Sequence, residues 1–416
     1  MSHFMGLRVN LVILSIIVVF STCAKNKNVA SPDNPMEGVG TYKRSSIIKT
    51  IKTIHGDVYD CVDIYKQPGM HHPAMATDRI RMVISQEVKR RKDQRRRSEE
   101  MDQNRRSTSA AELLWLNKKG CPIGSVPIRR MLKSNHRKSR RKVHPHDYNL
   151  GRRNFTEYAP PGRVDFTGLT VTNAPSGGFS GAKATMTIWN PKLKGDNQYS
   201  SASIYIERGD NQIRVGWIVY PALYHDSRTR LFSRWTSDNY GKTGCYINHC
   251  PGFVIFSNTI PLDYAYPDIS KSEGTQYDTT LTVFKGTDGD WVLNFDDEDE
   301  NLGMWTKSIF SSMSETAAQL RFGGESFEAE GEVYSPEMGS GAFVNGQYDK
   351  TCYMRRLFYI DPVYGGNVVD DSMVQAQDSR CYYCGDNGFN YKDDWYAYSF
   401  LFGGGGGKDN VDCFDN

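Results

Sequence analysis

The chain has 416 residues, of which 38% are hydrophobic and 12% aromatic, and its net charge is only +3. A chain of this length and apolar content can bury a sizeable core and exceeds one average domain, which excludes a wholly disordered protein. The small net charge hides an asymmetry. Residues 25–153 hold 30 basic and 13 acidic residues, a net of +17, whereas residues 154–416 hold 20 and 35, a net of −15.

The first residues follow the pattern of a secretory signal. Arg8 precedes the apolar run VNLVILSIIVVF and the small residues at 21–24, which is the charged, apolar and small-residue order of a signal peptide. The run is shorter than the roughly 18 to 20 apolar residues of a membrane span. We therefore predict a cleaved signal at 1–24, no membrane span afterwards, and an extracellular or vacuolar protein.

The basic segment predicts a partner within the same chain. It includes the runs KRRKDQRRRSEE (89–100) and HRKSRRK (136–142), while the acidic segment includes DDEDE (296–300). Basic runs also suit nucleic acid, but export argues against that partner. Opposite charges on adjoining segments indicate that residues 25–153 dock in cis as a propeptide, whose dibasic sites mark its removal.

The secondary-structure signals change near residue 164. Residues 77–104 are charged and helix-favouring, and Ser109 and Glu112 have capping-box spacing. Later residues form short β-patterned runs separated by Gly, Asn, Asp and Pro, namely KATMTIWN, SASIYIE, IRVGWIVY, GFVIFSN, DTTLTVF and WVLNF. We predict a mainly β fold, an antiparallel two-sheet β-sandwich at 154–416, preceded by a small, partly helical basic propeptide. The stretch SMSETAAQL (312–320) is expected to be helical.

Nine cysteines in an exported chain predict disulfides. Cys23 leaves with the signal. Cys61 and Cys121, both in the basic segment, most simply pair with each other, and Cys245 and Cys250 are close enough to close one loop. The CYYC spacing that contains Cys381 and Cys384 could indicate a redox or metal site, but disulfides are favoured in an oxidising compartment. We expect no metal and no cofactor. Asn154, in NFT, is a glycosylation acceptor.

One strand carries an unexpected charge. NQIRVGWIVYP (211–221) alternates so that Ile213, Val215 and Trp217 share the core face, while Arg214 lies on the other face among apolar residues and a glycine. A permanent charge in such a place needs a carboxylate opposite it.

Several motifs, in order, carry a family resemblance. They are TIKTIHGDVYDCVDIYKQPGMHHP (50–73), GCPIGSVPIRR (120–130), GAKATMTIWNP (181–191), the long run from VGWIVYP to CPGFV (215–254), GGE (323–325) and EMGSGAF (337–343). Together they resemble the plant neprosin family over most of residues 47–405. The resemblance implies a secreted zymogen, a sandwich of two antiparallel sheets, and an acid-acting glutamic peptidase that cuts after proline. It also suggests a bridge between Cys381 and Cys413, which leaves Cys352 and Cys384 as additions that we expect to pair with each other.

The resemblance places two catalytic glutamates, and this sequence has one of them. Glu325 of GGE matches one. The other lies three residues before the Trp of the GW strand, where this chain has Arg214. If Arg214 faces Glu325, it holds that carboxylate ionised and removes the partner with which acid and base roles alternate. Hydrolysis by the family mechanism should then fail.

Two functions of different classes remain open at this stage. The first is a glutamic peptidase zymogen, active only if another carboxylate serves; Glu207, Glu328 and Glu330 are the candidates, each more simply a solvated strand end. The second is a non-catalytic protein whose cleft binds proline-rich peptide or wall polysaccharide. Its candidate aromatic residues are Trp189, Trp235 and Tyr240, which equally suit core packing.

Overall fold

The computed structural model describes most of the chain from residue 42 onward. The described residues are 42–53, 55–74, 80–81, 83–86, 120–130, 162–174, 177–195, 197–248, 250–295, 300–363, 365–385, 397–408 and 412–413. The expected signal peptide, both long basic runs, the capping-box pair and Asn154 lie outside them. Within the described part, no helix has the length and apolar character needed to span a membrane.

The segment with the first family motifs forms a sheet of its own. Its three antiparallel strands lie in sequence order, β1 (Ile47–Lys52), β2 (Val58–Asp63) and β3 (Ser125–Arg129). Short 3-10 helices surround them, η1 (Arg44–Ser46), η2 (Ile64–Lys66) and η3 (Pro68–His71). Residues 80–81 and 83–86 are helical, so this segment is partly helical as expected. The Cys61–Cys121 disulfide forms as predicted and ties β2 to the chain just before β3.

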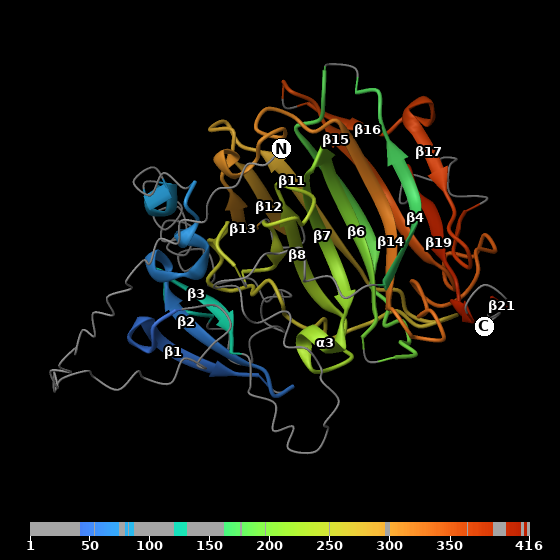
Figure 1. The fold of residues 1–416 in the computed structure, drawn as a ribbon, viewed down its shortest axis with the longest axis horizontal. Coiled ribbons are helices and arrows are strands. Elements are labelled where there is room, and N and C mark those ends of the chain that lie inside the picture. The colour runs from blue at the N-terminus through green and yellow to red at the C-terminus, as the bar shows by residue number, and fades with distance from the viewer. Residues whose placement is uncertain are drawn as a thin grey trace, which may run out of the picture. The chain divides into compact units, whose positions relative to one another are not determined.

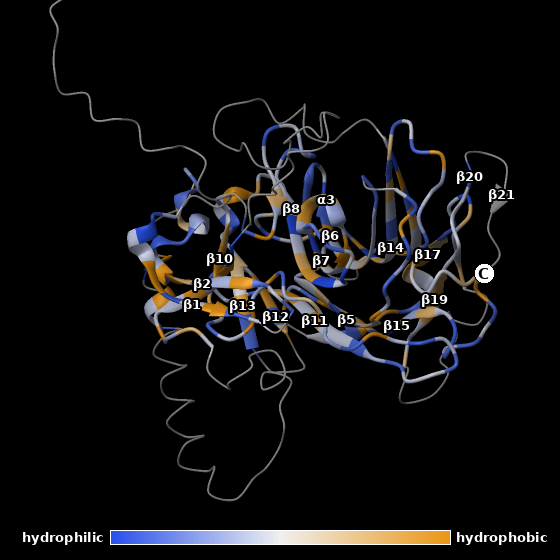
Figure 2. Ribbon diagram, turned by 90° about the horizontal axis from the view of Figure 1, so that it is seen from below, coloured by the Kyte–Doolittle hydropathy of each residue, from blue (hydrophilic) through white to orange (hydrophobic). Residues whose placement is uncertain are grey.

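The rest of the chain forms two large sheets that lie in two layers (Figure 2). The first has the order β10-β13-β12-β11-β5-β15-β19-β18, with β16 paired to β15. Its strands are β5 (Gly181–Thr187), β10 (Phe253–Ile255), β11 (Asp278–Lys285), β12 (Trp291–Phe295), β13 (Glu300–Trp305), β15 (Cys352–Ile360), β16 (Gly366–Val368), β18 (Tyr383–Cys384) and β19 (Phe400–Gly403).

The second sheet, of seven strands, has the order β17-β4-β14-β6-β7-β8-β9 (Figure 1). Its strands are β4 (Gly162–Val171), β6 (Tyr199–Arg208), β7 (Asn211–Val219), β8 (Arg230–Thr236), β9 (Cys245–Tyr246), β14 (Gln319–Ala329) and β17 (Val374–Gln377). The remaining elements are α3 (Pro221–Tyr224), η6 (Lys307–Ile309), η7 (Asp371–Met373) and the pair β20 (Gly407–Lys408) and β21 (Asp412–Cys413). The predicted mainly β, antiparallel two-sheet fold is confirmed.

The core lies between the two sheets, and β7 shows how the sequence builds it. Ile213, Val215 and Trp217 are fully buried, and the Trp217 indole N–H donates to the Thr187 carbonyl of β5, 2.8 Å away in the other sheet. Since side chains alternate along a strand, Arg214 lies on the opposite, outer face of the seven-stranded sheet. The predicted division of this strand into two faces is therefore confirmed.

The helix expected at 312–320 does not form. Residues 311–318 are bends and an isolated bridge, and residues 319–320 begin β14. The backbone groups that a helix would use bond to other elements instead: the Met313 carbonyl accepts from the Trp291 indole, and Ala317 exchanges two backbone hydrogen bonds with Phe179. Tertiary partners thus override a good local helix propensity.

The Cys245–Cys250 disulfide also forms as predicted, but the expected Cys352–Cys384 pairing is wrong. Both thiols are free and buried. They lie opposite the same residue, Phe402 of β19, from the two neighbouring strands β15 and β18. Two strand spacings amount to about 9.5 Å, beyond the roughly 7 Å between Cα atoms that a disulfide tolerates. Cys381 is disulfide-bonded, and its pairing with Cys413 stays a prediction.

Candidate functional site

The outer face of the seven-stranded sheet carries a buried ion pair at its centre. Arg214 of β7 and Glu325 of β14 lie on either side of β6, and an Arg214 Nη1 atom contacts Glu325 Oε1. The register sets Arg214 opposite Tyr205 and Glu325 opposite Ser201, so the arginine reaches diagonally across β6. The condition stated in the sequence analysis, that Arg214 faces Glu325, is met in the structure.

Glycines give the strands of this site their close approach. A Cβ on Gly216 would lie 1.9 Å from the Ala202 carbonyl oxygen, and one on Gly323 would lie 2.2 Å from the Thr167 carbonyl oxygen. Either contact would force the neighbouring strands apart. The glycines of the GW and GGE motifs therefore serve the packing that brings Arg214 and Glu325 within reach of each other.

Polar side chains of β6 complete the hydrogen bonding of the pair. The Tyr199 hydroxyl donates to Glu325 Oε1 at 2.6 Å, and the Tyr205 hydroxyl donates to Oε2 at 3.0 Å. Arg214 donates through Nε to Ser203 Oγ at 3.1 Å and through Nη2 to Ser201 Oγ. We call Arg214, Glu325 and these four β6 residues the Arg214 cluster.

The Arg214 cluster is closed to water. Arg214 is 1% exposed and Glu325 7%, and the guanidinium carbon lies 4.9 Å from the ring centre of Tyr205 and 5.1 Å from that of Phe232. A buried charge is tolerated only with a partner and satisfied hydrogen bonds, and both conditions are met here.

The electrostatics keep Glu325 ionised. Burial raises the pKa of Glu325, but the charge of Arg214, the hydroxyl of Tyr199 and the charges of Arg234 and Arg321 more than offset it, so the pKa lies below its ordinary value. Burial raises the pKa of Tyr199 and of Tyr205, so both phenols remain neutral donors. Glu325 is thus a carboxylate with no proton to donate, and its low basicity makes it a poor general base.

The candidate replacement carboxylates lie elsewhere. Glu207 shares the outer face, but it lies six residues along β6 from Ser201, about 20 Å at strand spacing, and it binds Arg321 at 2.6 and 2.8 Å. Glu328 is three residues from Glu325 on β14, hence on the opposite face, and it contacts Arg163. Glu330 is exposed beyond the end of β14. None of the three stands beside Glu325.

The three aromatic residues considered for ligand binding do not lie on the same face of the sheet. Trp189 and Trp235 belong to the buried core, with 5% and 1% exposure. Trp235 pairs with Ile213 across β7 and β8, which places it on the face away from the Arg214 cluster. Only Tyr240 of the three borders the outer face, where its ring centre lies 3.9 Å from the Arg234 guanidinium carbon. Trp189 and Trp235 therefore pack in the core, which was the alternative role considered for them.

Sequence reasoning missed the residues that serve the pair from β6. A signal was present: SASIYIE places Ser201, Ser203 and Tyr205 on one face of a predicted strand, and three polar side chains in a row on a buried strand need partners. Arg234 was also missed, although it follows the same alternation on β8 and stands opposite Arg214.

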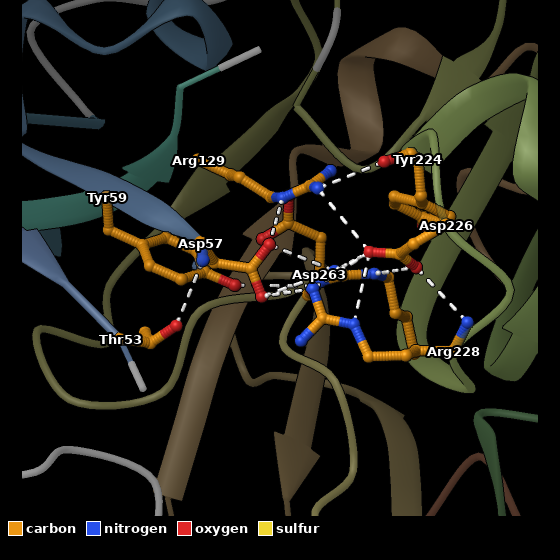
Figure 3. A network of polar contacts seen from close by, with 9 residues as sticks. Thr53, Asp57, Tyr59, Arg129, Tyr224, Asp226, Arg228 and Asp263 are labelled. Carbon is orange, nitrogen blue, oxygen red and sulfur yellow. Dashed lines mark hydrogen bonds and ion pairs between the residues drawn. The ribbon is translucent and has the colours of Figure 1, made fainter. Parts of the chain in front are cut away.

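A second polar cluster joins the β1–β3 sheet to the two-sheet domain (Figure 3). Asp57, just before β2, accepts hydrogen bonds from Arg129 at 2.9 Å, from Arg228 at 2.9 Å and from Arg230 at 3.0 Å. Asp226 accepts from Arg228 at 2.8 Å and from Arg230 at 2.5 Å. We call these five residues the interdomain network.

Asp226 of the interdomain network stays charged at acid pH. Burial raises the pKa of Asp226, but hydrogen bonds from Arg230 and Arg228 and the charge of Arg230 outweigh it and lower the pKa to about 2. The contact also differs from the simple charge picture of the sequence analysis: the basic segment contributes a buried carboxylate, Asp57, and the acidic segment contributes two of the three arginines that hold it.

Other contacts extend this interface along β10. The Gln67 side chain donates to the Ile255 carbonyl at 2.9 Å and accepts from the Ile255 N–H at 2.7 Å, as a neighbouring strand would. The Asn258 side chain donates to the Cys121 carbonyl at 2.7 Å. The His72 ring lies edge-on to Trp235, with ring centres 5.8 Å apart, and burial lowers the pKa of His72.

No group of three or more His, Cys, Asp or Glu side chains within the described ranges is arranged to hold a metal ion. The buried carboxylates described above contact arginines and hydroxyls, and His72 contacts an aromatic ring.

Comparisons with known proteins give the following matches. A family model described as Neprosin matches residues 196–405, and one described as Neprosin activation peptide matches residues 50–154. Among solved structures, scytalido-glutamic peptidase with a transition state analog inhibitor is 10% identical with a TM-score of 0.32, covering 58% of this chain and 98% of that one. SCP-B, a member of the Eqolisin family of peptidases in complex with a tripeptide, is 9% identical with a TM-score of 0.28 and the same coverage.

Proposed function

The chain belongs to the Neprosin family. We propose that it is a secreted zymogen of the glutamic-peptidase type. In this proposal the mature domain binds a peptide or polysaccharide but does not hydrolyse it by the two-carboxylate mechanism. The observation that carries this proposal is the buried contact between Arg214 and Glu325. In the proposed scheme residues 1–24 are the signal, 25–153 the removable activation peptide and 154–416 the functional domain.

The chemistry of the pair supports a loss of hydrolysis. A glutamic peptidase needs one carboxylate as general base for water and one carboxylic acid as proton donor to the oxyanion or leaving amine. Arginine keeps its proton at every accessible pH, so Arg214 can take neither role. Glu325 alone, ionised and bonded to Arg214, Tyr199 and Tyr205, has no partner with which to alternate.

The face around the pair supports binding. Partly exposed Tyr240 and Tyr246 lie beside Arg234 on the outer face, and tyrosine presents a rigid amphipathic surface that suits proline rings and sugar rings alike. We therefore propose a proline-containing peptide or a wall polysaccharide as the bound polymer, with the activation peptide held in cis until it is removed.

Peptide hydrolysis at acid pH tests the proposal. The purified protein, acid-treated to release any removable segment, is incubated with a proline-containing peptide and the products are read by mass spectrometry. We expect no cleavage from the natural chain and post-proline cleavage from Arg214→Glu, because the new carboxylate and Glu325 repel each other and one pKa rises into the working range.

Two further variants make the result specific. Glu325→Gln added to Arg214→Glu should abolish the gained activity. Arg321→Glu, which adds a carboxylate on the same face where Glu207 already holds the arginine, should gain none. Cleavage by the natural chain that Glu325→Gln abolishes would overturn the proposal, since Glu325 would then work beside Arg214.

A further inference from the structure

Arg234 stands out among the arginines of the outer face. Arg214 is paired with Glu325, and Arg321 is paired with Glu207. Arg234, by contrast, makes no hydrogen bond and no ion pair with any residue that the structure describes, and its side chain is partly exposed. Of these three arginines, only Arg234 has no carboxylate as a partner within the described part of the chain.

Two tyrosine rings hold the Arg234 guanidinium in place. Its central carbon lies 3.9 Å from the ring centre of Tyr240 and 4.7 Å from that of Tyr246. Tyr246 is the β9 partner of Arg234 in the sheet register, and the Tyr240 hydroxyl donates to Gln212 Oε1 at 2.7 Å. Stacking uses the faces of a guanidinium and leaves the N–H groups at its edge free to donate.

A held guanidinium with free donors matches one kind of ligand group. The planar fork of arginine binds a carboxylate through two parallel hydrogen bonds. The side chain is already ordered by the two rings, so little further entropy is lost when the ligand binds. The neighbouring Arg214 is opposite Arg234 in the register but is neutralised by Glu325, so the free charge is confined to one position.

We infer that Arg234, held between Tyr240 and Tyr246, is the docking point for the carboxylate of an acidic residue in a peptide bound across β7 and β8. The inference rests on the proposed binding function of this face and adds a sequence preference to it. A polymer of acidic sugars carries a carboxylate on every unit and needs a row of free cations. Among the described arginines on this face, Arg234 is the one without a paired carboxylate, and a single acidic residue in a peptide fits that number.

Peptide binding with matched peptides tests the inference. Fluorescein-labelled proline-alanine octapeptides carry one glutamate, placed in turn at each position, or glutamine at the same position, and binding to the acid-treated full chain is followed by fluorescence anisotropy at pH 6 and low salt. We expect at least one glutamate peptide to bind about tenfold more tightly than its glutamine counterpart, the effect of one charge-assisted contact. Arg234→Gln should remove that difference.

Matched variants and a second ligand separate the outcomes. Lys242→Gln removes an exposed cation from the loop that contains Tyr240 and should leave the glutamate preference unchanged, while Arg234→Lys should keep part of it. Binding of both peptides without a preference overturns the Arg234 inference but leaves the proposed function standing. Binding of neither the peptides nor oligogalacturonate contradicts both. Binding of oligogalacturonate that depends on Arg234, without peptide binding, overturns the peptide assignment. Thermal unfolding of each variant verifies that the fold persists.

Discussion

The Arg214 cluster and the interdomain network bury charges in two different ways. The cluster pairs one arginine with one glutamate inside a single rigid sheet, and two phenols and two serines satisfy the remaining bonds. The network shares two aspartates among three arginines from chain segments far apart in sequence. Removing one member of the pair leaves the other charge buried and unpaired. Removing one member of the network leaves each remaining charge with at least one partner of opposite sign. The first arrangement determines the chemistry of the site, and the second holds two parts of the chain together.

The largest effect should come from breaking the pair. Arg214→Ala leaves Glu325 buried without its cation, and we expect a loss of about 3–5 kcal/mol in the free energy of unfolding, measured by denaturant titration at pH 7. The pH dependence should weaken as well. In the natural chain the lowered pKa of Glu325 gives stability above about pH 4.3 that is lost as the pH falls. In the variant, the Tyr199 hydroxyl and the charges of Arg234 and Arg321 still oppose the effect of burial, but the largest lowering contribution is gone. The pKa of Glu325 should therefore be higher than in the natural chain, and less stability should be lost as the pH falls.

A control isolates the charge from the packing. Arg214→Met with Glu325→Leu replaces both charges by apolar groups and should lose much less stability than Arg214→Ala alone. An equal loss in both would contradict the view that the unpaired carboxylate is the cause.

Breaking the network should have a smaller and more local effect. Asp57→Asn removes the charge that Arg129, Arg228 and Arg230 share, but Asp226 remains with the arginines. We expect faster hydrogen exchange in β1–β3 by about 10- to 100-fold, because a charged hydrogen bond contributes roughly 1.5–3 kcal/mol, with little change in β7. Asp63→Asn, which removes a carboxylate from a partly exposed pair with Lys66, should change little. Equal effects of the two variants would contradict the role assigned to Asp57.

Acid should act on the interface through His72 before it protonates Asp226 of the network. Burial against Trp235 favours the neutral imidazole, so docking is fully supported above about pH 6.5 and weakens as the pH falls through that value and the undocked form takes up protons. Asp226, with a pKa of about 2, stays ionised over this range. His72→Phe should therefore reduce the difference in proteolytic protection of residues 42–74 between pH 7.5 and pH 5. His71→Phe, at the exposed neighbour, should keep the full difference.

The smallest expected effect concerns the two free thiols. Cys352 and Cys384 are buried, and burial raises the pKa of Cys352 to about 12, so little thiolate forms at neutral pH. Alkylation followed by mass spectrometry should label neither residue in the folded protein and both after unfolding. Recovery of the two residues as one disulfide-linked peptide would contradict the strand order β15-β19-β18.

The sequence by itself determined the strand pattern and two disulfides, Cys245–Cys250 within one loop and Cys61–Cys121 across 60 residues. Alternation along NQIRVGWIVYP assigns each side chain to a face, for which nearby residues suffice. That Glu325 faces Arg214 was only a condition in the sequence analysis, and its basis was the family resemblance. The partners of the pair were decided only by the register of β6 between β7 and β14, which aims Tyr199 and Tyr205 at the carboxylate.

The features that the sequence analysis predicted wrongly depend on tertiary structure. Residues 311–318 do not form a helix because their backbone groups bond to distant elements. Cys352 and Cys384 are separated by an intervening strand, β19, which no local sequence pattern reveals. The interdomain network joins Asp57 to Arg228 and Arg230 across more than 170 residues. Alternation and turn signals act over a few residues, whereas strand order and buried polar contacts depend on which distant segments meet.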